Sequence, residues 1–182
     1  MLQTCALSVL MFTGASQFAL VGVVGGGGSV WAGAVAAALL GSRNALYGLR
    51  LSSLLNVRGL RRVPAAQFVI DETTAMAIAR EDPALGRFAF WATGVALFTL
   101  WNLGTIGGAL ATHAISNPKV FGLDAAPPAA FLALLAPRLR AREPLAIAIA
   151  SAVVAIVATP FVPAGVPLLI VALLVAMYGL LR

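Results

Sequence analysis

Residues 67–80 read QFVIDETTAMAIAR, and the arrangement of the whole chain depends on how this stretch meets a membrane. The apolar segment from 64 to 80 is about 17 residues long and contains the adjacent acids Asp71 and Glu72. A helix needs about 20 apolar residues to cross the hydrocarbon core of a bilayer. By hydropathy alone the segment can therefore cross a membrane, enter and leave it on one side, or lie on its surface.

The composition of the chain indicates that a membrane is present. Of the 182 residues, 61% are hydrophobic and 10% are charged, and the mean hydropathy is +0.99. An ordinary soluble domain has about 25% charged residues, and a soluble protein of this size leaves much of its surface in water. We therefore predict an all-α integral membrane protein.

Charge and motifs exclude several classes of function. The net charge of +6 comes largely from arginines at the ends of apolar segments, a pattern that orients membrane proteins and does not indicate nucleic-acid binding. Cys5 is the only cysteine and His113 the only histidine, which excludes a cysteine metal cluster and argues against a zinc enzyme. We expect no nucleic-acid partner, no metal, no cofactor and no enzymatic activity.

Apolar runs predict the membrane-crossing helices. The clear candidates are residues 4–25, 30–55, 88–113, 144–162 and 165–181. A less regular candidate, 117–136, contains Pro127 and Pro128. Because proline suits the first turn of a helix and not its interior, we expect a half-helix from about Ala126 to Ala136 there.

Arginine-rich loops decide between the interpretations of segment 64–80. If the segment crossed the membrane, Arg138, Arg140 and Arg142 would lie on the opposite side from the basic loop 58–62, against the rule that cytoplasmic loops are rich in Lys and Arg. If it enters and leaves on one side, only Lys119 is misplaced. The sequence thus predicts a single membrane domain over residues 1–182. We expect a polytopic helical bundle of about six crossings plus one re-entrant or broken segment, with both termini cytoplasmic.

Polar residues in the first two predicted helices are candidates for a binding site. Thr13, Ser16 and Gln17 are spaced to share one helical face, where they either pack against a neighbouring helix or line a polar cavity. Arg43 lies near the middle of helix 30–55, where a charge costs about 3 kcal/mol. We expect it to face the protein interior. There it either forms a structural ion pair with Asp71 or Asp124, or contacts an anionic group of a substrate.

Acidic residues supply the remaining candidates. Gln67, Asp71 and Thr74 are spaced to share one helical face, and Glu72 points away from it. The two acids are either solvated on a surface helix or form a cation or proton site in a cavity. Asp124 precedes the expected half-helix, where it either caps the helix or belongs to the site.

Five stretches carry a family resemblance: FTGASQF (12–18), SRNALYGL (42–49), DETTAMAIA (71–79), WNLGTIGG (101–108) and FGLDAAPPAAFLALLAP (121–137). In this order they resemble the AzlC/YgaZ family, the large subunit of bacterial branched-chain amino acid exporters. The resemblance implies export of Val, Leu, Ile and sometimes Met across the bacterial inner membrane. It also implies a small membrane subunit of the AzlD/YgaH type as partner.

The sequence departs from the family pattern in two places. Family members usually carry a further membrane segment before the FTGASQF-like helix, and the resemblance implies that this segment is absent here. Where the family often reads N-x-R-H, this chain reads GSRN (41–44). Arg43 matches, whereas Gly41 and Asn44 replace the Asn and the His, so a proton role for that histidine is not carried over.

These observations predict a secondary transporter subunit that exports branched-chain amino acids with the proton gradient. A zwitterion would place its carboxylate near Arg43 or a half-helix N-terminus and its ammonium near Asp71 or Asp124. The alternative is a non-transporting scaffold subunit that assembles with partner membrane proteins. The candidate substrate-binding residues are Thr13, Ser16, Gln17, Arg43, Asn44, Asp71, Glu72 and Asp124.

Overall fold

The computed structural model describes residues 1–114, 122 and 125–181, and in these residues it contains helices and loops without a strand. The chain forms two compact units. The first combines residues 1–17 with the chain from Leu40 to the end of α6, and the second combines Phe18–Leu39 with the chain from α7 onward. The all-α prediction is confirmed.

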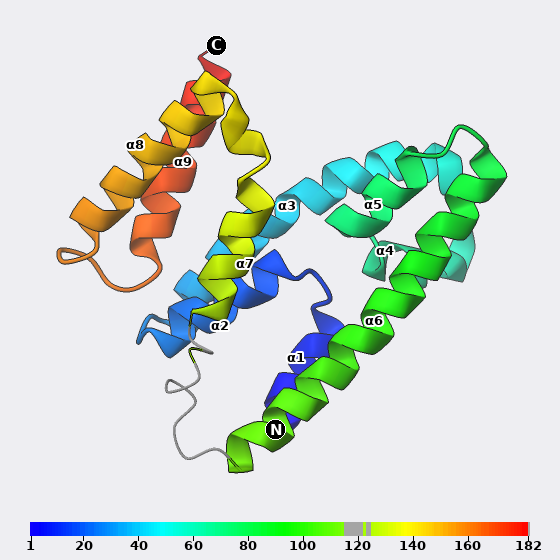
Figure 1. Cartoon of the computed structure of the whole chain (residues 1–182), viewed down its shortest axis with the longest axis horizontal. Helices are drawn as coiled ribbons and strands as arrows, with labels where there is room; N and C mark the ends of the chain where they lie inside the picture. Colours follow the sequence, from blue (N-terminus) through cyan, green and yellow to red (C-terminus); the bar gives the residue numbers. More distant parts are fainter. Residues whose placement is uncertain (115–121, 123–124, 182) are drawn as a thin grey trace. The chain divides into compact units, whose positions relative to one another are not determined.

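Figure 1 shows the order of the helices along the chain. Their bounds are α1 (Leu2–Leu10), α2 (Ala15–Gly25), α3 (Val30–Leu55), η1 (Gly59–Arg61), α4 (Arg62–Gln67), α5 (Asp71–Ile78), α6 (Pro83–Ala114), α7 (Ala126–Leu135), η3 (Arg138–Arg140), α8 (Arg142–Ala158) and α9 (Val166–Leu180).

Two predicted helices are broken. The single helix expected over 4–25 is wrong, because α1 ends at Leu10 and α2 begins at Ala15. Gly14 lies between them with φ of 58°, a left-handed conformation that glycine adopts readily and that a continuous helix excludes. The segment 64–80 is likewise divided, into α4 and α5.

The predicted crossings are supported only in part. One helix in the described part of the chain, over Pro83–Ala111, is long and apolar enough to cross a membrane, and α2 and α9 are apolar but shorter. The half-helix expected over 126–136 is observed as α7. Most of the preceding stretch from 117, including Asp124, lies outside the described residues.

Helix α6 is the element on which other helices of the first unit pack. Helix α5 packs along its first half and α1 along its second half (Figure 1). Gly86 allows the approach of α5, because a Cβ there would lie 2.9 Å from the Ala77 carbonyl oxygen. At the other end, Ser8 Oγ lies 3.1 Å from Thr105 Oγ1. The buried core beside α6 includes Leu51, Leu55, Ala65, Val69, Ala77 and Phe90.

Aromatic rings join the two helix breaks. Phe12 lies in the α1–α2 break and is 4% exposed. Its ring meets Phe98 of α6 edge-on at 5.2 Å and Phe68, in the α4–α5 break, at 6.2 Å. Gly94 of α6 leaves room for Phe68, since a Cβ there would lie 2.7 Å from Phe68 Cδ2. The two breaks therefore lie side by side against α6.

The second unit contains the paired helices α8 and α9 (Figure 1). Tyr178 Oη donates a hydrogen bond to Glu143 Oε1 at 3.3 Å and joins the two helices. The start of α9 lies against α2, because a Cβ on Gly165 would be 2.6 Å from Val23 Cγ1. The glycine-rich turn after α2 also makes a close contact, since a Cβ on Gly28 would collide with the Ala164 carbonyl oxygen. Small residues thus permit the packing of this unit.

Candidate functional site

Thr73 organises the break between α4 and α5. Ile70 is extended, with φ of −132° and ψ of 173°, and α5 begins at the next residue. The buried Thr73 hydroxyl donates to the Phe68 carbonyl oxygen at 2.5 Å and accepts from the Ile70 N–H at 3.1 Å. These two hydrogen bonds satisfy backbone groups in the break and hold Asp71 and Glu72 in the first turn of α5. Carboxylates are favoured there, because the N-terminus of a helix carries partial positive charge.

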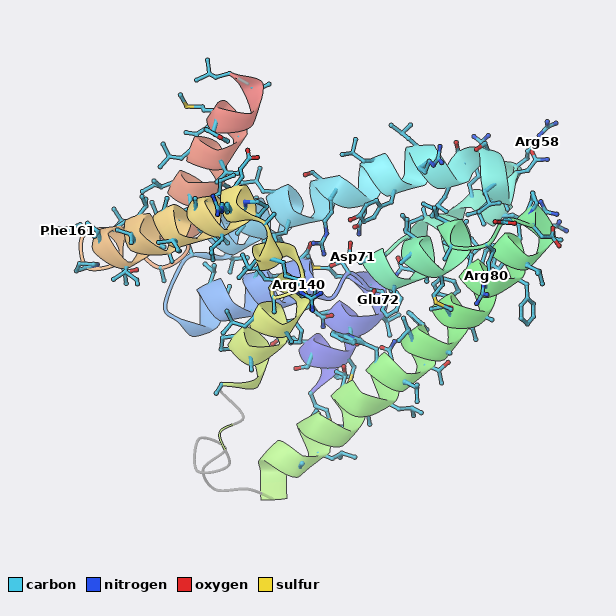
Figure 2. All side chains as sticks on the ribbon, turned by 45° about the horizontal axis from the view of Figure 1, so that its top comes forward. Arg58, Asp71, Glu72, Arg80, Arg140 and Phe161 are labelled. Atoms are coloured by element: carbon cyan, nitrogen blue, oxygen red, sulfur yellow. The ribbon has the colours of Figure 1, made fainter. Side chains whose placement is uncertain are left out.

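Asp71 forms an ion pair with Arg43 of α3. Arg43 Nη2 lies 2.7 Å from Asp71 Oδ2, and the side chains are 38% and 37% exposed. Figure 2 shows Asp71 and Glu72 at the start of α5, with Arg80 at the other end of that helix. The pairing of Arg43 with Asp71 that the sequence allowed is confirmed. The alternative partner, Asp124, lies outside the described residues.

The ion pair leaves unused hydrogen-bonding capacity on both partners. Arg43 Nε and Asp71 Oδ1 are buried and have no hydrogen-bond partner among the described residues, and the same holds for the hydroxyls of Thr13 and Thr74. A buried polar atom without a partner costs about 1–3 kcal/mol, and folded proteins contain few of them. These four residues are therefore candidates for contact with a polar ligand.

The α1–α2 break contacts the chain near both partners of the ion pair. A Cβ on Gly41 of α3, two residues before Arg43, would lie 3.2 Å from Ser16 Oγ. Through Phe12 and Phe68 the same break contacts the chain just before Asp71. The two helix breaks and α3 therefore approach one another within the first unit.

The comparison with known families bears on these same residues. A family model described as AzlC protein matches residues 1–115, which include both breaks, Arg43 and Asp71. The chain belongs to the AzlC family. It is therefore a membrane protein of a family related to amino-acid transport. No curated protein and no solved structure matches it.

Ser16 and Gln17 of this AzlC protein lie in the first turn of α2, and they are 2% and 8% exposed. Thr13 does not share their helical face as predicted, because it lies in the break. Trp101 Nε1 donates to Gln17 Oε1 at 3.1 Å. Sequence reasoning missed Trp101 as a partner of this amide, although the stretch WNLGTIGG that contains it carried the family resemblance.

The prediction that Gln67, Asp71 and Thr74 share one helical face is wrong for Gln67. Helix α4 ends at Gln67, whose Nε2 donates to the Val9 carbonyl oxygen of α1 at 2.7 Å. Asp71 and Thr74 share a face of α5 in this AzlC protein. Glu72 is exposed and Asn44 is half-buried, and no described contact brings either residue to the ion pair.

Replacing Thr73 by Val will destabilise the protein by about 1–3 kcal/mol, because the Ile70 N–H and the Phe68 carbonyl oxygen lose their buried partner. Thr73→Ser keeps the hydroxyl and will unfold close to the unchanged protein. Thermal unfolding of both variants in the same detergent checks this. Equal stability of the Val variant would show that the break does not depend on the hydroxyl.

Proposed function

We propose that this chain is the transport subunit of a secondary exporter of branched-chain amino acids, driven by the proton gradient across the bacterial inner membrane. The observation that carries the proposal is the Arg43–Asp71 ion pair, in which each partner keeps one buried atom without a hydrogen bond. An α-amino acid is a zwitterion, and it offers one charged group to each of these partners.

The substrate would bind by replacing the contact between Arg43 and Asp71 with its own contacts to each of them. Its carboxylate contacts the guanidinium of Arg43, which matches a carboxylate with two parallel hydrogen bonds. Its ammonium group contacts Asp71. The hydroxyls of Thr13 and Thr74 are further buried groups without partners. Such exchange offsets the loss of the internal ion pair and favours ligands that carry both charges.

Asp71 is the group to which we assign the coupling proton. It is half-buried at the start of α5, in contact with the arginine that would hold the substrate carboxylate. Protonation removes its charge, and with that charge its attraction for both Arg43 and the substrate ammonium. A proton bound from one side of the membrane would therefore release the substrate there.

The broken helices support the topology of about six crossings with a re-entrant segment. Helices α4 and α5 contain 6 and 8 residues, about 9 and 12 Å at 1.5 Å per residue, too short to cross a bilayer. The segment begins just after Arg58, and both Arg58 and Arg80 lie at the end of the unit where α3 ends and α6 begins (Figure 2). The segment thus returns to the end at which it started. With the arginine-rich loops taken as cytoplasmic, both termini are cytoplasmic too.

Cysteine labelling in intact cells checks this topology. In a Cys5→Ser background, single cysteines at Arg58, Glu81 and Arg140 will be protected from a membrane-impermeant maleimide. A cysteine at Phe161, in the loop between α8 and α9, will react. Reaction at position 81 together with protection at 58 would show that the segment crosses, and would overturn the re-entrant arrangement.

Flux in a reconstituted complex tests the function. The chain is reconstituted with a small membrane subunit of the AzlD/YgaH type, which we propose as its partner, and a proton gradient is imposed. Labelled valine and leucine will move with the gradient, and a protonophore will stop the movement. An assembled complex without flux would contradict the transporter and favour the scaffold. We assign no enzymatic activity to the chain, because binding and proton transfer suffice for the proposed transport.

A further inference from the structure

An open cavity lined by both polar and apolar side chains lies at the opposite end of α5 from Asp71. Its volume is about 380 Å³, and it is lined by the last turns of α3, the end of α5 and the start of α6. All three elements belong to the first unit. The lining residues include Arg50, Ser53, Leu54, Arg80, Pro83 and Arg87.

Three arginines from three different segments line this cavity, and no acidic side chain is among its lining residues. Arg50, Arg80 and Arg87 are exposed, and none of them forms an ion pair in the part of the chain that the structure describes. Arg87 Nη1 donates only to the Leu54 carbonyl oxygen, at 3.5 Å. The nearby Asp82 uses Oδ1 to accept from the Ala84 N–H at the start of α6. Three like charges around one space favour a bound anion.

One arginine of the cavity lies near the start of the helix that is long and apolar enough to cross a membrane. Arg87 is four residues after Pro83, where the membrane-length helix begins, so it is about 6 Å from that end at 1.5 Å per residue. Leu54 and Ile78 line the same cavity, and Ile78 is 46% exposed. A ligand with a negative head and an apolar tail would meet the arginines and these two side chains together.

We propose that this cavity binds the phosphate-bearing headgroup of an acidic phospholipid, held by Arg50, Arg80 and Arg87, with its acyl chains along Leu54 and Ile78. Guanidinium groups bind phosphate oxygens through paired hydrogen bonds. Basic pockets between membrane helices bind anionic headgroups. The site is separate from the Arg43–Asp71 pair and does not depend on the substrate of the transporter.

Native mass spectrometry of the full chain in neutral detergent tests the proposal. Phosphatidylglycerol is titrated against the unchanged protein, against a triple variant in which Arg50, Arg80 and Arg87 become Gln, and against a control with Gln at Arg58, Arg61 and Arg62. The two variants lose the same charge. Each also loses one arginine bond to a backbone carbonyl, because Arg62 Nε donates to the Val57 oxygen.

Phosphatidylglycerol will bind the unchanged protein and the control variant with one tight site, and the cavity variant about a hundredfold more weakly. Equal weakening in the two variants would overturn the proposal, because it would reflect net charge alone. Phosphatidylcholine and inorganic phosphate are titrated in parallel. Weak binding of both is expected, whereas inorganic phosphate bound as tightly as the lipid would assign the cavity to a soluble anion instead.

A milder variant guards against loss of folding. Arg80→Gln alone removes one lining charge. Arg80 lies just after α5, outside any helix, and its side chain forms no hydrogen bond or ion pair with the described residues. It will weaken phosphatidylglycerol binding by about fivefold while the unfolding temperature without lipid stays unchanged. Unaltered binding in this folded variant would contradict the role of Arg80.

Discussion

Asp71→Asn will lower proton-driven efflux of valine and leucine by about tenfold or more in a complex that still assembles. Arg43→Gln will do the same, because each variant removes one of the two charges that the substrate exchanges with. A hydrogen bond to a charged group contributes about 1.5–3 kcal/mol, so flux falls by about tenfold or more. Counterflow of labelled valine in proteoliposomes measures the loss.

The double variant separates transport from folding. Each single variant leaves one charge without its partner and will destabilise the protein by about 1–3 kcal/mol. This is less than for a fully buried pair, since the two side chains are 38% and 37% exposed. In Arg43→Gln/Asp71→Asn no charge is left unpaired, so thermal stability will recover. Transport will stay low if the pair binds substrate. Recovery of both would show that the pair is structural.

Gly94→Ala will have the second large effect, although an alanine is otherwise favourable in a helix. The new Cβ would lie 2.7 Å from Phe68 Cδ2 and 2.9 Å from Phe68 Cγ. The ring must therefore leave its place against α6, and with it the edge-on contact to Phe12. We expect a loss of about 1–3 kcal/mol in stability. Transport will fall as well, because both helix breaks lose their common support.

Gly104→Ala is the matched control in the same helix. Nothing lies within 4 Å of a Cβ there, so this variant keeps or gains stability, by up to about 1 kcal/mol. Combining Gly94→Ala with Phe68→Leu shortens the colliding side chain and will restore part of the loss. If Gly94→Ala and Gly104→Ala unfold at the same temperature, the contact with Phe68 does not support the breaks.

Hydropathy predicted those elements whose ends are marked by local composition. The helix expected over 30–55 is observed as Val30–Leu55, and the expected half-helix begins at Ala126 with proline in its first turn. The α1–α2 break was missed, because Gly14 is the only helix-breaking residue in FTGASQF and a single glycine is tolerated inside a helix. Only the left-handed conformation of Gly14 separates a break from a continuous helix.

The sequence predicted which types of residue form the candidate site. It did not predict most of their hydrogen-bond partners. An arginine in the middle of an apolar helix requires a counter-charge, and that reasoning led to Asp71. The partners of Gln17 and Gln67 could not be found in this way. Trp101 lies 84 residues from Gln17, and Val9 lies 58 residues from Gln67. Neither spacing leaves a periodic signal along the chain.

The hydrogen bond from Gln67 to the Val9 carbonyl has a mechanical consequence. A helix that ends within a membrane leaves its last carbonyls without partners, and each bare carbonyl in hydrocarbon costs several kcal/mol. Separating α1 from α4 would leave the Val9 carbonyl without this partner. The bond therefore couples the ends of α1 and α4 in any movement that opens the region around the ion pair toward water.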